Sequence, residues 1–367
     1  MFSKFLRLFQ FGFFGILFYT ATSFAQTLKP GFDADEYLGV LHRCSQHVDK
    51  KFKLDLTKTM NFEKVYDSPE MGLKNKWELW VNKDKTTIAI DLRGTTSDQS
   101  SLLENFYSAM IPAEGKLNIE PGKPFSYKFA GTPKALVHVG WAIGISCLIP
   151  DITEKIKTWY GKGVRQILIE GHSQGGALAF LLTSYIRYQM ADGKLPKDLV
   201  IKTYCSAGPK PGNLYYAYDY DFLTRGGWGF NVVSTVDWVP EMPGTIQTLK
   251  DINDDPFGFT KRSMRKQNFI VRYYITHIYN QLNRSTKKAQ RKYEKYLGRK
   301  LYTQIAKYLV DLDQPEYAHS FNYATAGTTI VLQPDAEYHK IFPDTGSNIF
   351  RHHLFAPYYY LVNKNYK

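Results

Sequence analysis

Cysteine is scarce in this sequence: Cys44, Cys147 and Cys205 are its only three in 367 residues. They are too few and too scattered to form a disulfide framework or a cysteine metal site, and at most one bridge can join two of them. Cys147 and Cys205 lie in apolar stretches, which favours buried thiols over metal ligands. The sequence therefore excludes a small scaffold that depends on disulfides, and it leaves the disulfide state of the three residues open.

Long apolar runs are absent beyond the first residues of the chain. At that start, Lys4 and Arg7 precede a mostly apolar stretch over residues 8–19, and small residues lead up to Ala25. This order is typical of a secretory signal, so we expect cleavage after Ala25 and an exported protein, either periplasmic or secreted. A membrane anchor is the alternative, but the apolar stretch is short for a span and is interrupted by Gln10.

Acidic residues are nearly missing from one segment of the chain. Of the 47 Lys and Arg residues, 14 fall within residues 261–310, where Glu294 is the one acid, and the rest of the chain balances 33 basic against 33 acidic residues. The net charge of +13 is therefore concentrated in this segment. A local surplus of this kind indicates one interacting face, whereas a diffuse surplus would indicate only solubility.

The same segment contains apolar and aromatic positions between Phe269 and Tyr279. This pattern predicts helices that pack their apolar face on the domain and turn their cations outward. A solvated face normally mixes both signs of charge, so we expect residues 261–310 to dock on an anionic membrane surface. A solvated or protein-binding face is the alternative. No nucleic-acid partner is expected, because an export signal takes the protein away from most nucleic acid.

The rest of the chain alternates between strand and helix patterns. The expected helices cover residues 34–48, 102–111, 141–159 and the stretch after residue 173, and the expected strands cover residues 77–81, 86–90, 135–141, 164–170, 198–206, 230–236 and 328–332. Such alternation predicts an α/β fold with a mainly parallel sheet and helices on both faces. Ligands of such sheets bind beyond the carboxyl ends of the strands, where Thr95, Ser173 and Asp237 fall.

The most informative stretch is Gly-His-Ser-Gln-Gly-Gly, residues 171–176, between a buried strand and a helix of small residues. This context is typical of a nucleophile elbow, which holds a serine at strained backbone angles with its hydroxyl exposed. Side chains at Gly171 or Gly175 would collide with the neighbouring strand or helix. The N–H of Gln174, at the positive end of the new helix, is expected to point toward an oxyanion beside Ser173. An ordinary serine in a glycine-bordered turn is the alternative.

A serine nucleophile needs a base that takes its proton and an acid that orients the base, and α/β-hydrolases supply them in the chain order Ser, Asp, His. Ser173, Asp237 and His353 have this order, and Asp237 follows an apolar strand that can fix it. The other acids in range fall in a polar loop, and other histidines can supply the imidazole. These alternatives are Asp251, Asp254 and Asp255, and His319, His339 and His352.

Further motifs extend this pattern over roughly Trp77–Gly244 and Ala318–Leu361. In chain order they are Arg93-Gly94-Thr95, Val137-His138-Val139-Gly140, the elbow with Ala177, Pro209-Lys210-Pro211-Gly212-Asn213, Asp237-Trp238-Val239-Pro240-Glu241-Met242-Pro243 and the terminal histidine followed by Leu354. With these motifs the chain resembles the class 3 lipases, the fungal-lipase-like branch of the α/β-hydrolases.

The resemblance implies that Ser173 is the nucleophile, Asp237 the acid and His353 the base. It also implies that Thr95 and the N–H of Gln174 form the oxyanion hole. The gap of 116 residues between Asp237 and His353 is longer than the family usually has. The histidine is also doubled, so His352 remains an alternative base, while His138 has no part in the scheme and is expected to be structural.

The predicted organisation is a signal peptide over residues 1–25 and one α/β-hydrolase domain over residues 26–367. Within it, residues 96–136 are implied by the resemblance to form a lid region, and residues 245–315 are expected to form a basic helical insertion. No oligomeric state is predicted.

The predicted activity is cleavage of carboxylic esters of lipids through an acyl-enzyme, as in a triacylglycerol lipase, without a metal or organic cofactor. A phospholipase A1 or a short-chain carboxylesterase is an alternative, because the triad does not select the alcohol. A second alternative is a catalytically inactive protein that keeps the fold and binds a lipid or other anionic surface.

Overall fold

The computed structural model describes residues 28–47, 62–120, 122–253 and 268–367. The predicted signal peptide lies outside the described residues, as do Asp254, Asp255 and the first residues of the basic segment, 261–267. Among the described helices, none combines the length and apolar character that crossing a membrane requires.

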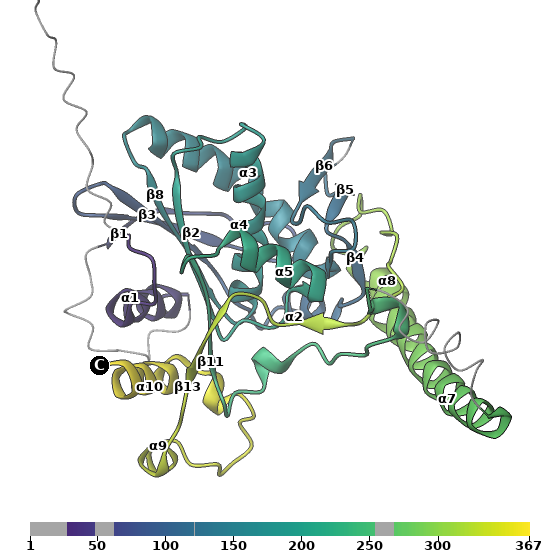
Figure 1. The fold of residues 1–367 in the computed structure, drawn as a ribbon. Coiled ribbons are helices and arrows are strands. Elements are labelled where there is room, and N and C mark those ends of the chain that lie inside the picture. Colours follow the sequence, from purple (N-terminus) through teal and green to yellow (C-terminus); the bar gives the residue numbers. More distant parts are fainter. Residues whose placement is uncertain (1–27, 48–61, 121, 254–267) are drawn as a thin grey trace, which may run out of the picture.

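A seven-stranded sheet forms the centre of the molecule (Figure 1). In spatial order its strands are β1 (Phe62–Asp67), β2 (Trp77–Asn82), β3 (Thr87–Leu92), β8 (Gln166–His172), β9 (Val200–Ser206), β11 (Gly229–Ser234) and β13 (Thr328–Leu332). The pairs β1–β2 and β2–β3 are antiparallel, and every later pair is parallel. The predicted hairpin and the mainly parallel sheet are confirmed.

Helices cover both faces of this sheet, as Figure 1 shows. One face carries α3 (Val139–Gly161) and α4 (Gln174–Ala191), and the other carries α1 (Ala34–Ser45) and α10 (Phe355–Tyr366). Within β3, Ile88 and Ile90 pack in the core under α3 and α4, while Ala89 packs in the core under α1 and α10. This two-residue alternation buries both faces of the strand. The predicted α/β-hydrolase fold class is confirmed.

Residues 96–136, predicted as a lid region, form one helix and three short strands. These are α2 (Gln99–Phe106), β4 (Met110–Pro112), β5 (Glu114–Asn118) and β6 (Pro124–Lys128). The predicted helix over 102–111 is wrong at both ends. Asp98 starts it earlier by accepting from the N–H of Ser100. It ends earlier because Met110 and Ile111 pair with β7 (Leu136–His138), which shows tertiary pairing overriding a local helical pattern.

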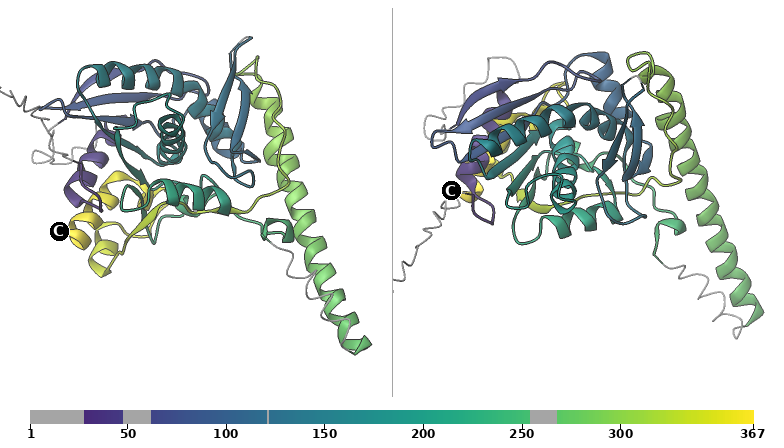
Figure 2. Two further views of the ribbon diagram at one scale, coloured as in Figure 1. Left: turned by 45° about the horizontal axis from the view of Figure 1, so that its top comes forward. Right: turned by 90° about the horizontal axis from the view of Figure 1, so that it is seen from above.

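The basic segment forms α7 (Phe269–Glu294), a π-helical segment (Lys295–Lys300) and α8 (Leu301–Ile305). We call α7 the arm, because it projects from the body with its Phe269 end farthest away (Figure 2). The prediction that its apolar residues pack on the domain is wrong: Phe269 is 71% exposed, Ile270 68% and Tyr274 66%. Buried residues of the arm occur only near its other end, at Gln290 and Glu294, so within the described part of the chain the early turns meet no sheet or helix that could cover them.

Candidate active site

Ser173 lies in the turn between β8 and α4, at φ 61° and ψ −127°. Such angles are strained for a residue with a Cβ and persist only where the surroundings impose them. Here the backbones approach so closely that a Cβ on Gly171 would collide with the backbone of Gly175, and a Cβ on Gly175 would collide with the carbonyl of Leu92 in β3. The steric role predicted for the two glycines is confirmed.

Ser173, His353 and Asp237 lie in one hydrogen-bonded row. His353 Nε2 is 2.8 Å from Ser173 Oγ, and His353 Nδ1 is 2.8 Å from Asp237 Oδ2. Ser173 is partly exposed, whereas His353 and Asp237 are buried. The turn after β11 supplies the acid, and the short 3-10 helix before α10 supplies the imidazole. The structure therefore brings together the three residues chosen from the sequence.

The alternatives considered for acid and base lie in other contacts. The ring of His352 bonds instead to the Tyr338 hydroxyl at 2.7 Å and to Asp344 at 2.6 Å. Asp251 bonds to the N–H and hydroxyl of Thr248, at 2.6 and 2.8 Å. His319 pairs with Glu294, and His339 pairs with Asp344. Among the described histidines, His353 is the one bonded to Ser173.

Asp237 is held by three hydrogen bonds. Its Oδ1 accepts from the N–H of Val239 at 3.0 Å, and its Oδ2 accepts from His353 and, at 2.8 Å, from the hydroxyl of Tyr358. Burial raises the pKa of Asp237, but these hydrogen bonds and the attraction of His353 outweigh burial and hold the pKa below its ordinary value. The carboxylate is thus kept ionised. Nothing in the sequence singles out Tyr358, because it is one of three consecutive tyrosines on α10.

A second hydrogen-bonded row fixes the backbone of His353. Since a carbonyl can only accept, His172 Nε2 donates to the carbonyl of His353 at 2.8 Å. Burial and the neighbouring His353 lower the pKa of His172 to about 3, so its ring is neutral and Nδ1 accepts. Ser206, at 2.9 Å, must then donate to Nδ1, and Tyr37, at 2.6 Å from Ser206 Oγ, donates to Ser206. The row therefore runs from α1 through β9 and the elbow to His353.

Thr95 and Gln174, the predicted oxyanion-hole residues, flank the elbow. Gln174 is the first residue of α4, so its N–H has no carbonyl partner within the helix. Thr95 is exposed and follows Gly94, where a Cβ would lie 2.9 Å from the carbonyl oxygen of His172. Asn105 donates to Thr95 Oγ1 at 2.8 Å, which leaves the hydrogen of the Thr95 hydroxyl to point to another acceptor.

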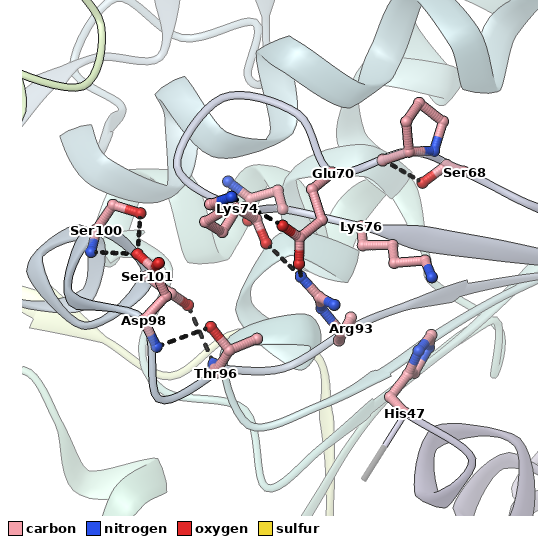
Figure 3. A network of polar contacts seen from close by, with 12 residues as sticks. His47, Ser68, Glu70, Lys74, Lys76, Arg93, Thr96, Asp98, Ser100 and Ser101 are labelled. Carbon is pink, nitrogen blue, oxygen red and sulfur yellow. Dashed lines mark hydrogen bonds and ion pairs between the residues drawn. The ribbon is translucent and has the colours of Figure 1, made fainter.

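Polar contacts brace this loop on both sides (Figure 3). On one side Arg93 donates to Glu70 at 2.8 Å and to the carbonyl of Lys74 at 2.7 Å. On the other side the N–H of Thr96 donates to Ser101 Oγ at 3.1 Å. The loop between β3 and α2 is thereby tied to the turn before β2 and to the first turn of α2.

Glu104 of α2 is buried beside Gln174. Its Oε2 accepts from Asn75 at 2.7 Å. Burial raises the pKa of Glu104 to about 8, although the hydrogen bond from Asn75 opposes the rise. The side chain is therefore mostly protonated at neutral pH. Sequence reasoning assigned it no role, because its position within the lid region does not reveal burial.

Two groups of titratable side chains are structural. The ring of His138 is fully buried, caps α3 by accepting from the N–H of Trp141 at 3.3 Å and donates to the carbonyl of Asn105, which confirms the predicted structural role. His47, Glu78 and Asp91 lie close enough to share a metal ion. However, Lys64 Nζ is 2.9 Å from Glu78 Oε1 and His47 Nε2 is 3.1 Å from Asp91 Oδ2, so each carboxylate already lies beside a basic side chain.

The three cysteines are free thiols. Cys44 and Cys205 are buried. The prediction that Cys147 is buried is only partly confirmed, because its exposure is intermediate.

Comparison with known proteins supports the family. The sequence model described as lipase (class 3) matches residues 89–247, which contain Ser173 and Asp237. The resemblance to the class 3 lipases is confirmed over these residues, and it supports a lipase-like hydrolase. No curated protein sequence matches the chain.

Several solved fungal lipases are also similar to this chain. Lip2 lipase from Yarrowia lipolytica is 18% identical, with 57% of this chain and 72% of that chain covered and a TM-score of 0.43. A triacylglycerol lipase from Penicillium expansum is 20% identical, with 58% and 75% covered and a TM-score of 0.41. Lipase II from Rhizopus niveus is 20% identical, with 57% and 74% covered and a TM-score of 0.40. The match to the family's sequence model carries the assignment.

The steric constraint at the elbow predicts an asymmetry between two glycines. Gly175→Ala should lower the free energy of unfolding by at least about 2 kcal/mol, because its Cβ meets the backbone of β3. Gly161→Ala, at the end of α3 where a Cβ meets nothing within 4 Å, should change it by at most about 1 kcal/mol. Urea unfolding of both variants measures this. Equal destabilisation would contradict the close approach.

The raised pKa of Glu104 predicts a pH dependence of stability. The folded protein keeps a proton that the unfolded chain releases above its ordinary pKa of 4.5, so stability falls as the pH rises from about 4.5 to about 8. The wild type should lose up to about 1.4 kcal/mol per pH unit more than Glu104→Gln across this window. Chemical denaturation at several pH values tests it, and identical slopes would rule out a buried, protonated Glu104.

Proposed function

We propose that this chain, whose residues 89–247 match the class 3 lipases, is an exported serine hydrolase that cleaves carboxylic esters of lipids. The observation that carries the proposal is the hydrogen-bonded row of Ser173, His353 and Asp237 at the carboxyl ends of the parallel strands. Export rests on the signal-like residues 1–25.

In the proposed reaction, His353 Nε2 takes the hydroxyl proton of Ser173 as Oγ attacks the ester carbonyl carbon. Asp237 is ionised and hydrogen-bonded to Nδ1, so it stabilises the imidazolium that forms. The N–H of Gln174 and the hydroxyl of Thr95 donate to the oxyanion.

His353 then gives its proton to the departing alcohol, and the acyl group stays on Ser173 as an ester. A water molecule loses a proton to His353 and attacks the acyl carbon, which releases the acid and restores the serine. These steps use only side chains and backbone groups of the chain.

The side chains next to these residues favour a lipid ester. Large apolar residues follow the acid and the base directly: Trp238 is 39% exposed and Leu354 is 38% exposed. On α2, which follows Thr95 in the chain, Leu102 and Phe106 are also exposed. Apolar side chains exposed around a polar site are suited to contact acyl chains. We propose that residues 96–136, which contain α2, act as the lid region.

A hydrolysis panel separates this function from its alternatives. Turnover of triacylglycerol emulsions supports a lipase, release of fatty acid from the first position of phospholipids supports a phospholipase A1, and turnover of soluble p-nitrophenyl esters alone supports a carboxylesterase. No turnover of any of the three supports an inactive binding protein.

The proposed triad predicts a contrast between the two adjacent histidines. Ser173→Ala should lower kcat for a soluble ester by about 10⁴-fold or more, and His353→Ala should lower kcat nearly as much. His352→Ala is the matched control and should keep near-native turnover, because its ring bonds to Tyr338 and Asp344 instead. Initial rates measure this, with circular dichroism to verify folding. Near-native turnover by Ser173→Ala would refute the catalytic role.

The contact between Tyr358 and Asp237 predicts a positioning effect. Tyr358→Phe removes one donor from the carboxylate, so kcat should fall about tenfold with KM nearly unchanged, as expected for a hydrogen bond of about 1.4 kcal/mol. The loss of activity on acidification should begin at a higher pH, because this bond helps to lower the pKa of Asp237. Tyr366→Phe, at the exposed end of the same helix, is the control. Equal profiles for both variants would exclude the positioning role.

A further inference from the structure

Four exposed apolar side chains and four cationic side chains of the arm lie on one side of the helix. A helix completes five turns in 18 residues, so residues 18 apart lie on the same side, about 27 Å apart along the axis. Four apolar residues of the outer end therefore align with four basic residues nearer the body. The pairs are Phe269 with Lys287, Ile270 with Lys288, Tyr273 with Arg291 and Tyr274 with Lys292.

The outer group is exposed to an unusual degree. Phe269, Ile270, Tyr273 and Tyr274 are each more than 60% exposed, at 71, 68, 63 and 66%. Farther along the arm, Ile278 and Leu282 are 48% and 64% exposed. Aromatic and aliphatic side chains that remain in water over several turns lose the stabilisation that burial would supply, so a surface of this kind indicates a binding partner.

The inner group is a concentrated positive surface. Arg284 and Lys295 join the four basic residues around a recess of about 350 Å³ whose lining contains no acidic residue. The single acid of the arm, Glu294, is buried and bonded to Gln290, Arg299 and His319. It therefore does not offset the exposed cations, and their mutual repulsion is relieved by an anionic partner.

We propose that the arm docks on an anionic lipid bilayer, with the side that carries the four apolar and four cationic residues facing the bilayer. Phenylalanine, isoleucine and tyrosine side chains enter the boundary between headgroups and acyl chains, and lysine and arginine side chains nearer the body lie over anionic headgroups. The aromatic and aliphatic outer end distinguishes a bilayer from a nucleic acid, whose phosphates would engage only the cations.

Docking by the arm also orients the body. The N–H of Ala109 donates to the carbonyl of Leu297 at 3.2 Å, and a Cβ on Gly298 would lie 2.9 Å from the Cβ of Ala109. The arm is thus joined at its base to the segment between α2 and β4, and α8 packs on α2. A bilayer that holds the arm consequently restricts the orientation of the body through these contacts.

Cosedimentation of the full chain with vesicles tests the proposal. One variant replaces Lys287, Lys288, Arg291 and Lys292 with Gln, and the matched control replaces four exposed lysines of the body, Lys83, Lys157, Lys194 and Lys197, with Gln. On vesicles of phosphatidylcholine and phosphatidylserine at low salt, the arm variant should bind at least about tenfold more weakly than wild type, and the control should stay within about twofold. Added salt should weaken the binding of wild type to these vesicles until it approaches that of the arm variant.

A third variant, Ile270→Ser with Tyr274→Ser, isolates the apolar contribution. It should bind more weakly than wild type while keeping the same salt dependence. Equal binding by wild type and the arm variant, or equal binding of wild type to vesicles of phosphatidylcholine alone, would overturn the proposal. Binding to duplex DNA without binding to vesicles would overturn it in favour of a nucleic-acid surface.

Vesicle binding needs no catalysis and can be measured on Ser173→Ala. Docking is therefore tested independently of the proposed hydrolysis. Hydrolysis of a soluble ester by the arm variant should equal that of wild type. A matching loss of hydrolysis would assign these cations to the architecture of the active site and so overturn a docking role.

Discussion

The close backbone approach at the elbow is the constraint on which the rest of the site depends. Gly171 and Gly175 let β8, α4 and β3 meet at distances that exclude a Cβ, and this contact imposes the positive φ of Ser173. The same approach brings the loop after β3, with Gly94 and Thr95, against the elbow. Close packing of backbone segments therefore positions three groups at the site: the serine hydroxyl, the first N–H of α4 and the Thr95 hydroxyl. Such packing tolerates little adjustment.

The imidazole reaches this point through two hydrogen-bonded rows that meet at His353. One row, through Asp237 and Tyr358, fixes the ring and keeps a charge buried beside it. The other, through His172 and Ser206, fixes the carbonyl of the same residue. Because a long insertion separates Asp237 from His353, local sequence cannot hold the two together, and contacts across α1, β9 and α10 do so instead.

Features with local causes could be predicted from the sequence, and features that depend on tertiary contacts could not. Glycine spacing, apolar runs and the order of Ser173, Asp237 and His353 sufficed for the elbow, the sheet and the candidate triad. Tyr358 was missed because nothing in a run of tyrosines shows which one faces the carboxylate. The arm was misjudged for a related reason: an amphipathic pattern shows that a helix has an apolar side, but not whether another element lies against that side.

Labelling by a fluorophosphonate tests most directly whether His353 activates the hydroxyl of Ser173. Such a reagent reacts with activated serines and leaves ordinary ones unmodified. Peptide mapping by mass spectrometry after brief treatment of the wild-type protein should find one adduct, on Ser173, and the adduct should be missing from His353→Ala but present in His352→Ala. A wild-type protein that takes up no label, or takes it up on another residue, would exclude Ser173 as the activated nucleophile.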